Sequence, residues 1–221
     1  MVLPLACCLW PCSPAHAQVL AEHRVTVSGG VVWAGGYGIG DEAGTLRTNA
    51  FGAEPPPFTW FNTDSSIEPA AGAAGRIEVA LTRSLSIDGG ASYSTPTLGT
   101  TVSADTEAGT VVLEGEALQQ YVVDVGATWQ LPVTLGRRIR PFASGGAGYL
   151  RQLHETRTIV ETGQVYSAGG GVRVWLRGLS AGQRAVGLRA DVRANWRRKG
   201  IDFENVTRVF PSVTLMLFVG L

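Results

Sequence analysis

The sequence predicts an all-β protein, an eight-stranded antiparallel up-and-down transmembrane β-barrel. Apolar and polar residues alternate with a period of two in eight short segments, which is typical of strands that bury one face. The segments between them show no helical pattern and alternate between short and longer. An export signal opens the chain. Together these three observations are typical of small bacterial outer-membrane barrels.

The strand period is clearest in Ala185–Arg197. Arg189, Arg193 and Arg197 are spaced four apart, which on a helix would form one basic stripe. The even-numbered residues from 186 to 196 are all apolar, however, and a helix would scatter them over two opposite sides. A strand separates them cleanly from the polar residues. The same test predicts eight strands: Arg24–Trp33, Ala74–Leu81, Leu85–Ser94, Gln120–Leu131, Arg140–Leu153, Val172–Arg177, Ala185–Arg197 and Val209–Leu221.

The connections predict how these strands pair. Without crossover helices, consecutive strands run antiparallel as a meander, with turns at one end and loops at the other. Short and longer connections alternate along the chain: 82–84, 132–138 and 179–184 are short, and 35–70, 96–116, 154–163 and 199–206 are longer.

The first 17 residues are interpreted as a cleaved signal peptide. An apolar run is followed by Ala15-His16-Ala17, a small-residue cleavage site. Residues 18–221 then form the barrel domain. All three cysteines lie in the signal peptide, so the mature chain has no disulfide, no cysteine nucleophile and no thiolate metal site. The formal charge is zero, which argues against nucleic-acid binding, and we expect no cofactor or metal.

The polar faces distinguish a membrane barrel from a soluble, lipocalin-like ligand-binding barrel. They carry charges of both signs, as expected for a network that fills a narrow lumen: Arg76, Glu78, Asp88, Asp124, Arg173, Arg177, Arg189, Asp191 and Arg193. Several apolar faces end in an aromatic residue at a similar height, which predicts an interfacial girdle: Trp33, Tyr93, Tyr121, Tyr149 and Trp196. The soluble barrel is the alternative.

Partner charges are expected inside, because an uncompensated buried charge costs several kcal/mol. A turn near residue 182 would place Arg173 opposite Asp191. Arg76 and Glu78 would approach Asp88 across the second hairpin. Arg197 and Arg198 are expected at the rim, in contact with headgroup phosphates or water.

Two stretches, FPSVTLMLFVGL at the end and RPFASGGAGYL from Arg140, resemble the small OmpA-like outer-membrane β-barrel family over roughly residues 22–221. The resemblance implies contact with outer-membrane lipid and insertion by the barrel-assembly machinery, which reads an aromatic-ended last strand. This chain departs from that pattern, since it ends in Leu221 and its nearest aromatic residue is Phe218.

The predicted function is non-enzymatic: a structural, adhesive or partner-binding role through the extracellular loops. The first loop offers a candidate contact surface of Phe58, Trp60 and Phe61, with burial of these side chains against the barrel rim as the alternative. The first and second loops are where an extracellular ligand would bind. One alternative is a small pore through the charged lumen. Another is a lipid-modifying enzyme, since His154, Thr156 and Glu161 loosely resemble the His/Ser/Glu set of lipid A deacylases; we expect His154 to be a solvated rim residue instead.

Overall fold

The computed structural model describes residues 24–46, 58–105, 109–133, 135–136, 138–154, 159–177, 184–202 and 206–221. The predicted signal peptide lies outside these residues, and so does Thr156. The backbones of Phe58 and Arg177 lie in strands, but the predicted roles of their side chains also fall outside what the structure describes. None of the described residues forms a helix long and apolar enough to cross a membrane.

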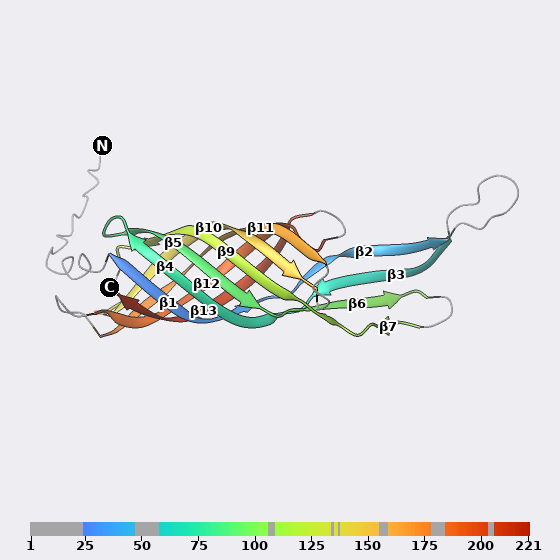
Figure 1. Cartoon of the computed structure of the whole chain (residues 1–221), viewed down its shortest axis with the longest axis horizontal. Coiled ribbons are helices and arrows are strands. Elements are labelled where there is room, and N and C mark those ends of the chain that lie inside the picture. Colours follow the sequence, from blue (N-terminus) through green and yellow to red (C-terminus); the bar gives the residue numbers. More distant parts are fainter. Residues whose placement is uncertain are drawn as a thin grey trace, which may run out of the picture.

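Eight antiparallel strands close into a barrel (Figure 1), which confirms the predicted fold class. The first strand pairs with the last, and every other strand pairs with its two neighbours in the chain order of the barrel. The barrel strands are β1 (Val25–Ala34), β4 (Ala70–Ala80), β5 (Leu85–Ser94), β9 (Gln119–Gln130), β10 (Ile139–Leu153), β11 (Val160–Arg177), β12 (Val186–Lys199) and β13 (Arg208–Gly220).

All eight predicted strands are present, and most bounds agree within one or two residues. The exception with the largest difference is β11, which begins at Val160 and not at Val172. Its added half carries Gly163 and the run Gly169–Gly171, which supply no side chain to either face. The alternation of apolar and polar side chains cannot be seen where glycines supply no side chain. This part of the strand could therefore not be predicted from the sequence.

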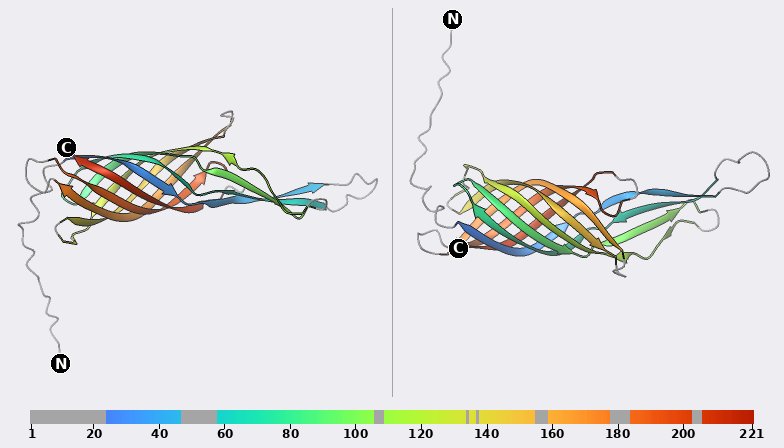
Figure 2. Two further views of the ribbon diagram at one scale, coloured as in Figure 1. Left: turned by 90° about the horizontal axis from the view of Figure 1, so that it is seen from below. Right: turned by 45° about the horizontal axis from the view of Figure 1, so that its top comes forward.

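The structure corrects the prediction for the two longest loops, because they contain strands as well. The added strands are β2 (Tyr37–Leu46), β3 (Phe58–Ile67), β6 (Thr97–Ser103), β7 (Val111–Val112) and β8 (Glu116–Ala117). They form a separate sheet in the order β2-β3-β6-β7, with β8 also paired to β6. We call these five strands the extension sheet. Figure 2 shows that it projects beyond one end of the barrel, opposite the end where the described chain terminates.

A glycine corner joins the barrel to the extension sheet. Gly35 and Gly36 separate β1 from β2. A Cβ atom at Gly35 would lie 2.8 Å from the Pro211 ring, and one at Gly36 would lie 2.7 Å from the Ile67 carbonyl oxygen. Only glycine therefore fits where the chain turns past β13 and β3.

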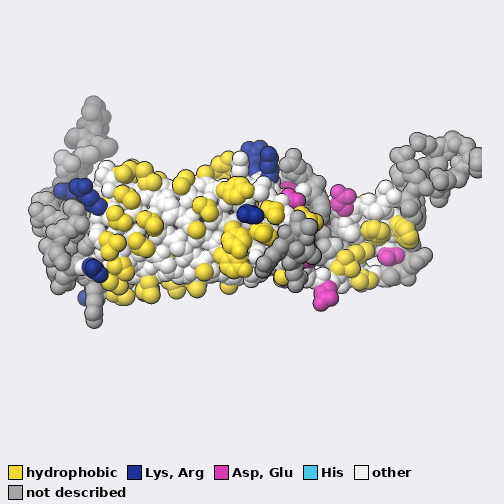
Figure 3. Space-filling view, in the orientation of Figure 1, with side chains coloured by type: hydrophobic (Ala, Val, Ile, Leu, Met, Phe, Trp, Pro, Cys, Tyr) yellow, Lys and Arg dark blue, Asp and Glu magenta, His cyan; other side chains and the backbone are white. Residues whose placement is uncertain are grey.

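Apolar side chains cover the outside of the barrel. On the wall strands the outward residues are mainly valine, leucine, isoleucine and alanine, and Val125 is 65% exposed. Buried charged residues lie on the inward faces of the same strands. Figure 3 shows the hydrophobic side chains spread along the barrel surface, with Lys and Arg side chains towards its two ends. A soluble barrel would reverse these faces, so the arrangement is that of a barrel that spans a membrane.

Candidate functional site in the barrel interior and at its outer mouth

Eight charged side chains converge in the middle of the barrel from five strands. Four are acidic and four are arginines, so their charges balance. All are buried except Asp124, which is partly buried. We call this set the ion cluster: Arg76 and Glu78 of β4, Asp88 of β5, Asp124 of β9, Arg173 of β11, and Arg189, Asp191 and Arg193 of β12. These are the predicted lumen residues other than Arg177.

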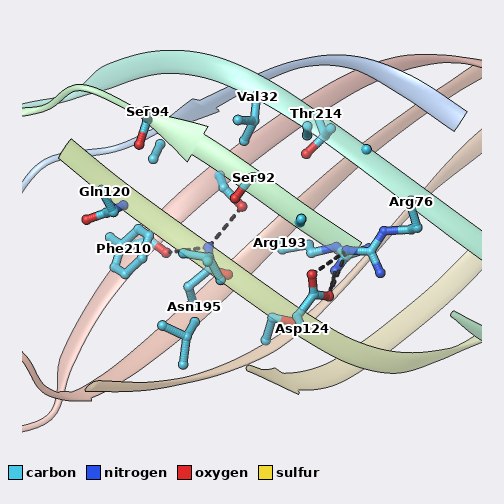
Figure 4. Close-up of a pocket in the computed structure, with 18 of the residues that line it drawn as sticks. Val32, Arg76, Ser92, Ser94, Gln120, Asp124, Arg193, Asn195, Phe210 and Thr214 are labelled. Atoms are coloured by element: carbon cyan, nitrogen blue, oxygen red, sulfur yellow. Dashed lines mark hydrogen bonds and ion pairs between the residues drawn. The ribbon is translucent and has the colours of Figure 1, made fainter. Parts of the chain in front are cut away.

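The first half of the ion cluster is organised around Arg76. Its guanidinium forms an ion pair with Asp88, as the second-hairpin hypothesis required. It also pairs with Asp124, with 2.7 Å between Nη2 and Oδ2. Figure 4 shows Arg76 and Arg193 converging on the Asp124 carboxylate. Thr128 Oγ1 donates a hydrogen bond of 2.8 Å to Asp88 Oδ2, which uses a further acceptor of that buried carboxylate.

The second half of the ion cluster is a continuous series of hydrogen bonds that begins with the charged residues of β12. Arg193 Nε donates to Asp191 Oδ1 at 3.0 Å, and Arg189 Nε donates to Asp191 Oδ2 at 3.1 Å. Arg189 Nη1 then donates to Glu78 Oε2 at 2.9 Å, and Glu78 also pairs with Arg173. Since Arg193 Nη1 lies 3.7 Å from Asp124 Oδ2, the two halves form one network.

The structure corrects the predicted register between β11 and β12. Arg173 is aligned with Arg189 and not with Asp191, whose partner is Gly171. The register shifts by one residue between Trp175 and Arg177, and the turn lies earlier than predicted; alternation along one strand reveals neither. Arg173 and Asp191 still belong to the same network, but Glu78 from across the lumen is the anion that pairs with Arg173.

An aromatic ring packs against the cationic part of the ion cluster. Phe142 of β10 is buried, and the guanidinium carbon of Arg189 lies 4.5 Å from its ring centroid. The guanidinium carbon of Arg173 lies 5.5 Å away. Cation–π contacts of this kind strengthen when they are removed from water. The inward position of Phe142 could not be predicted from the sequence, because the glycines of β10 obscure which way its residues face.

Inward glycines make room for the charged side chains. Gly90 is aligned with both Arg76 and Asp124, and Gly171 is aligned with Asp191. A Cβ atom at Gly90 would lie 2.6 Å from Asp124 Oδ1 and 2.8 Å from Arg76 Nη2. An eight-stranded lumen is just wide enough for side chains, so the long arginines fit because neighbouring inward positions are empty.

We expect Gly90→Val to lower the free energy of unfolding by about 1–3 kcal/mol, because the added side chain separates Arg76 from Asp124. The matched control is Gly89→Val, which faces outward and has only an ordinary backbone contact of 3.9 Å. Urea titration of both variants in lipid vesicles measures the difference. Equal midpoints for the two variants would show that the space at Gly90 is not needed.

The ion cluster lies between two small cavities. The outer cavity has a volume of about 90 Å³ and is lined in part by Ser92, Ser94 and Asn195 (Figure 4). The inner cavity has a volume of about 50 Å³ and is lined by Glu78 and Arg173 among others. The lining of the inner cavity also includes three buried apolar residues that pack together at the turn end: Trp175, Ala185 and Phe218.

The outer mouth of the barrel is closed by residues of the loops. The buried apolar residues Ile39, Ile67, Leu118 and Ile201 form one cluster, with Tyr37 and Leu98 packed against it. We call this set the outer cap. The Tyr37 ring stacks on Phe210 of β13, with centroids 4.9 Å apart. The outer cap therefore ties the start of the extension sheet to the barrel wall.

Arg197 is buried beneath the outer cap and donates hydrogen bonds to two of its residues. This corrects its predicted position at the rim. Only 1% of Arg197 is exposed. Its Nη1 donates to the Tyr37 hydroxyl at 2.9 Å, and its Nη2 donates to the Ile201 carbonyl. Burial raises the pKa of Tyr37 above its ordinary value although Arg197 acts to lower it, so this phenol stays neutral at physiological pH. Arg198, the next residue, is exposed as predicted.

Of the three residues considered for catalysis, the structure describes His154 and Glu161, and Thr156 lies outside the described residues. His154 is only 14% exposed, and its Nδ1 lies 3.0 Å from Glu116 Oε2 of β8. It is thus a partly buried, paired residue, which corrects the expected solvated rim position. Glu161 lies in β11 opposite Gln152. Within the described ranges, no group of three or more histidine, cysteine or acidic residues is placed to hold a metal ion.

The predicted aromatic girdle residues all point outward and are exposed: Trp33, Tyr93, Tyr121, Tyr149 and Trp196. The Tyr93 and Tyr121 rings lie 4.9 Å apart between centroids. Tyr166 of β11 is aligned with Trp196 and is also exposed; it was missed with the rest of that half-strand. In the first loop, Trp60 is exposed and lies 6.4 Å from the half-buried Phe61 ring.

No protein-family model matches the chain, and no curated protein matches it. Among solved structures, the outer membrane protein OprG from Pseudomonas aeruginosa is similar at 9% identity and a TM-score of 0.47, over 90% of this chain and 94% of OprG. The outer membrane protease OmpT from Escherichia coli is similar at 7% identity and a TM-score of 0.32, over 88% and 96%. By the geometry of its own two faces, the chain is a membrane-spanning eight-stranded β-barrel.

Proposed function

We propose that the protein is a non-enzymatic bacterial outer-membrane barrel that presents the extension sheet to a positively charged extracellular partner. The OmpA-like relationship, the cleaved signal peptide and insertion by the barrel-assembly machinery belong to this proposal. The observation that carries it is the combination of a barrel with a balanced, buried ion cluster and a sheet that continues from its wall strands.

The charge of the extension sheet favours a cationic partner. Every charged residue in its described strands and their described flanks is acidic: Asp41, Glu42, Asp64, Glu68, Asp105, Glu114 and Glu116. Asp41 of β2 lies directly opposite Asp64 of β3. Like charges at directly opposed positions destabilise a sheet. A cationic group bound between the two carboxylates would remove that cost. We therefore interpret the Asp41–Asp64 pair as part of a binding surface and not as a contact that stabilises the fold.

A closed interior favours a scaffold over the pore and enzyme alternatives. The ion cluster occupies the middle of the lumen, and apolar residues pack at both ends. His154 is held by Glu116, which belongs to the loop region. These contacts support a rigid platform that breaks no bond, with the loops as its binding region.

The binding test uses poly-lysine as the cationic probe and the full chain in vesicles. Asp41→Asn combined with Asp64→Asn should weaken poly-lysine binding at least tenfold at low salt, and poly-glutamate should not bind. The control is Glu114→Gln with Asp105→Asn, which removes the same charge at positions without the opposed pair. If both double variants bind poly-lysine equally weakly, binding depends only on net charge. That result would contradict a site at Asp41 and Asp64.

In planar bilayers we expect the purified protein to give no steady conductance steps, because the ion cluster and the outer cap block the lumen. An open porin in the same bilayer provides the positive control. Conductance steps whose ion selectivity changes in Arg193→Gln would show that the lumen conducts. That result would favour the pore over the scaffold.

A further inference from the structure

Three basic side chains gather at the loop end of the barrel wall. They are Arg151 of β10 and Arg198 and Lys199 of β12, and all three are exposed. None of them forms an ion pair with another described residue. The other exposed described cations lie at the opposite, turn end of the barrel: Arg24, Arg83, Arg138 and Arg184. We call Arg151, Arg198 and Lys199 the basic rim.

The strand register places the basic rim immediately outside the aromatic girdle. Gln164 of β11 is aligned with Tyr149 on one side and with Arg198 on the other. Arg151 follows Tyr149 by two residues, on the same face of β10, and Arg198 follows Trp196 in the same way. The cations therefore lie at the height of lipid headgroups, just beyond the interfacial aromatic rings.

Backbone geometry keeps two consecutive cations outside. Lys199 has φ of 64° and Gly200 has φ of 88°. Strand alternation would turn Lys199 inward after the outward Arg198, but the left-handed conformation breaks the alternation at this point. Lys199 is consequently exposed beside Arg198. A non-glycine residue with positive φ is uncommon and carries a conformational cost.

An apolar groove of about 370 Å³ lies on the outer wall directly below the basic rim. It exists because the small outward residue Ala147 of β10 lies between two larger neighbours, Val125 of β9 and Tyr166 of β11. Gln164 forms its polar upper edge, next to Arg198. The rest of the lining is Val123, Asp124, Val125, Ala147, Gly148, Tyr149 and Tyr166, and the Asp124 carboxylate itself points into the lumen towards Arg76.

We propose that this sector of β9–β12 binds one phosphorylated lipid of the surrounding leaflet. The lipid phosphate lies between Arg151, Arg198 and Lys199, and one acyl chain lies in the groove below. Arginine guanidinium groups suit phosphate oxygens because they donate two parallel hydrogen bonds. The groove faces the hydrocarbon of the bilayer, so an acyl chain is the occupant whose chemistry fits it.

Charge complementarity supports an anionic ligand at this sector. The extension sheet grows from the β1, β4 and β5 side of the barrel and is acidic, whereas the basic rim lies on β10 and β12. An anion approaching the outer surface is repelled by the first and attracted by the second. The two surfaces therefore bind ligands of opposite charge, and the lipid site does not depend on the proposed function of the extension sheet.

Native mass spectrometry of the full chain tests the headgroup contact, with phosphatidic acid as probe and phosphatidylcholine of the same acyl length as reference. We expect one phosphatidic acid retained per chain and no retained phosphatidylcholine. The variant Arg151→Ser/Arg198→Ser/Lys199→Ser should bind phosphatidic acid roughly a hundredfold more weakly, since each basic group near an anionic surface contributes about fivefold.

The matched control is Arg24→Ser/Arg138→Ser/Arg184→Ser, which removes three exposed cations from the other end of the barrel. It should bind phosphatidic acid like the unmodified chain. Equal loss of phosphatidic acid binding in the two triple variants would show that binding depends only on net charge, and would overturn the proposal. Unchanged phosphatidic acid binding in the Arg151/Arg198/Lys199 variant would overturn it as well.

A second pair of variants tests the groove separately from the charges. Ala147→Leu fills the hollow and should weaken phosphatidic acid binding about tenfold without changing the unfolding midpoint. Ala73→Leu is its control, because Ala73 also faces outward and lies between a valine and a tyrosine on neighbouring strands, Val31 and Tyr93. If Ala147→Leu binds as tightly as Ala73→Leu, the acyl chain does not occupy the groove and the proposal fails.

Discussion

Replacing Glu78 with glutamine is expected to lower the free energy of unfolding by about 3–5 kcal/mol. Glu78 is 5% exposed and is the anion for both Arg173 and Arg189. Glutamine keeps the volume of the side chain and removes its charge, so the buried Arg173 loses its anion and Arg189 keeps only its pair with Asp191. Urea unfolding of the barrel in phosphatidylcholine vesicles, followed by heat-modifiable gel migration, measures the loss.

Two further variants show whether the cause is the unpaired charge. Glu68→Gln, at an exposed position beside the extension sheet, should unfold like the unmodified protein. Arg173→Met in the Glu78→Gln background should recover part of the lost stability, because it removes the cation that has lost its anion. An unfolding midpoint unchanged by Glu78→Gln would mean that the ion cluster contributes nothing to the stability of the barrel.

The second large effect is expected on the outer face. Val125 lies midway along β9, between the Tyr121 and Trp129 rings, and is 65% exposed. In a membrane barrel, Val125→Arg places a charge in hydrocarbon and should cost about 2–4 kcal/mol of unfolding free energy. In a soluble barrel, Val125→Arg would be a substitution on the water-exposed surface. It should then change the free energy of unfolding by less than about 0.5 kcal/mol.

The control for this prediction is Val112→Arg in β7 of the extension sheet. Val112 is 73% exposed, and its strand lies beyond the barrel (Figure 1). We expect it to change the unfolding free energy by less than about 0.5 kcal/mol. A Val125→Arg variant as stable in vesicles as Val112→Arg would contradict a lipid-facing wall.

The barrel strands could be predicted because each one buries only one face. In β12, every inward position from Arg189 to Arg197 is polar, and the outward positions are apolar. That contrast is visible in one strand without its neighbours. The predicted girdle residues are exposed on the outer face for the same reason.

The extension sheet could not be predicted by the same test. Its strands have little contrast between faces, as in the run Asn62–Ser66 of β3. Backbone pairing with β2 and β6 holds this strand, and hydrogen bonding between main chains leaves no trace in side-chain periodicity. Long polar loops can therefore contain strands that a sequence pattern does not reveal.

The details of the site depend on contacts between distant residues. Arg197 was expected at the rim because it ends its strand, but Tyr37 of β2 folds over it, with its hydroxyl 2.9 Å from Arg197 Nη1. The pairing of Arg173 depends on a register shift in β11 and on Glu78, which is 95 residues away in the chain. Residue types predict that charges lie inside, whereas register and curvature decide which of them meet.

We propose that the full chain is a closed barrel in the outer membrane. This claim can be tested by expressing the chain, separating the outer membrane from the soluble periplasm, and comparing the migration of boiled and unboiled samples on a gel. We expect the protein in the outer-membrane fraction, with unboiled protein migrating differently from boiled protein. Recovery of folded protein in the soluble periplasm would contradict the claim.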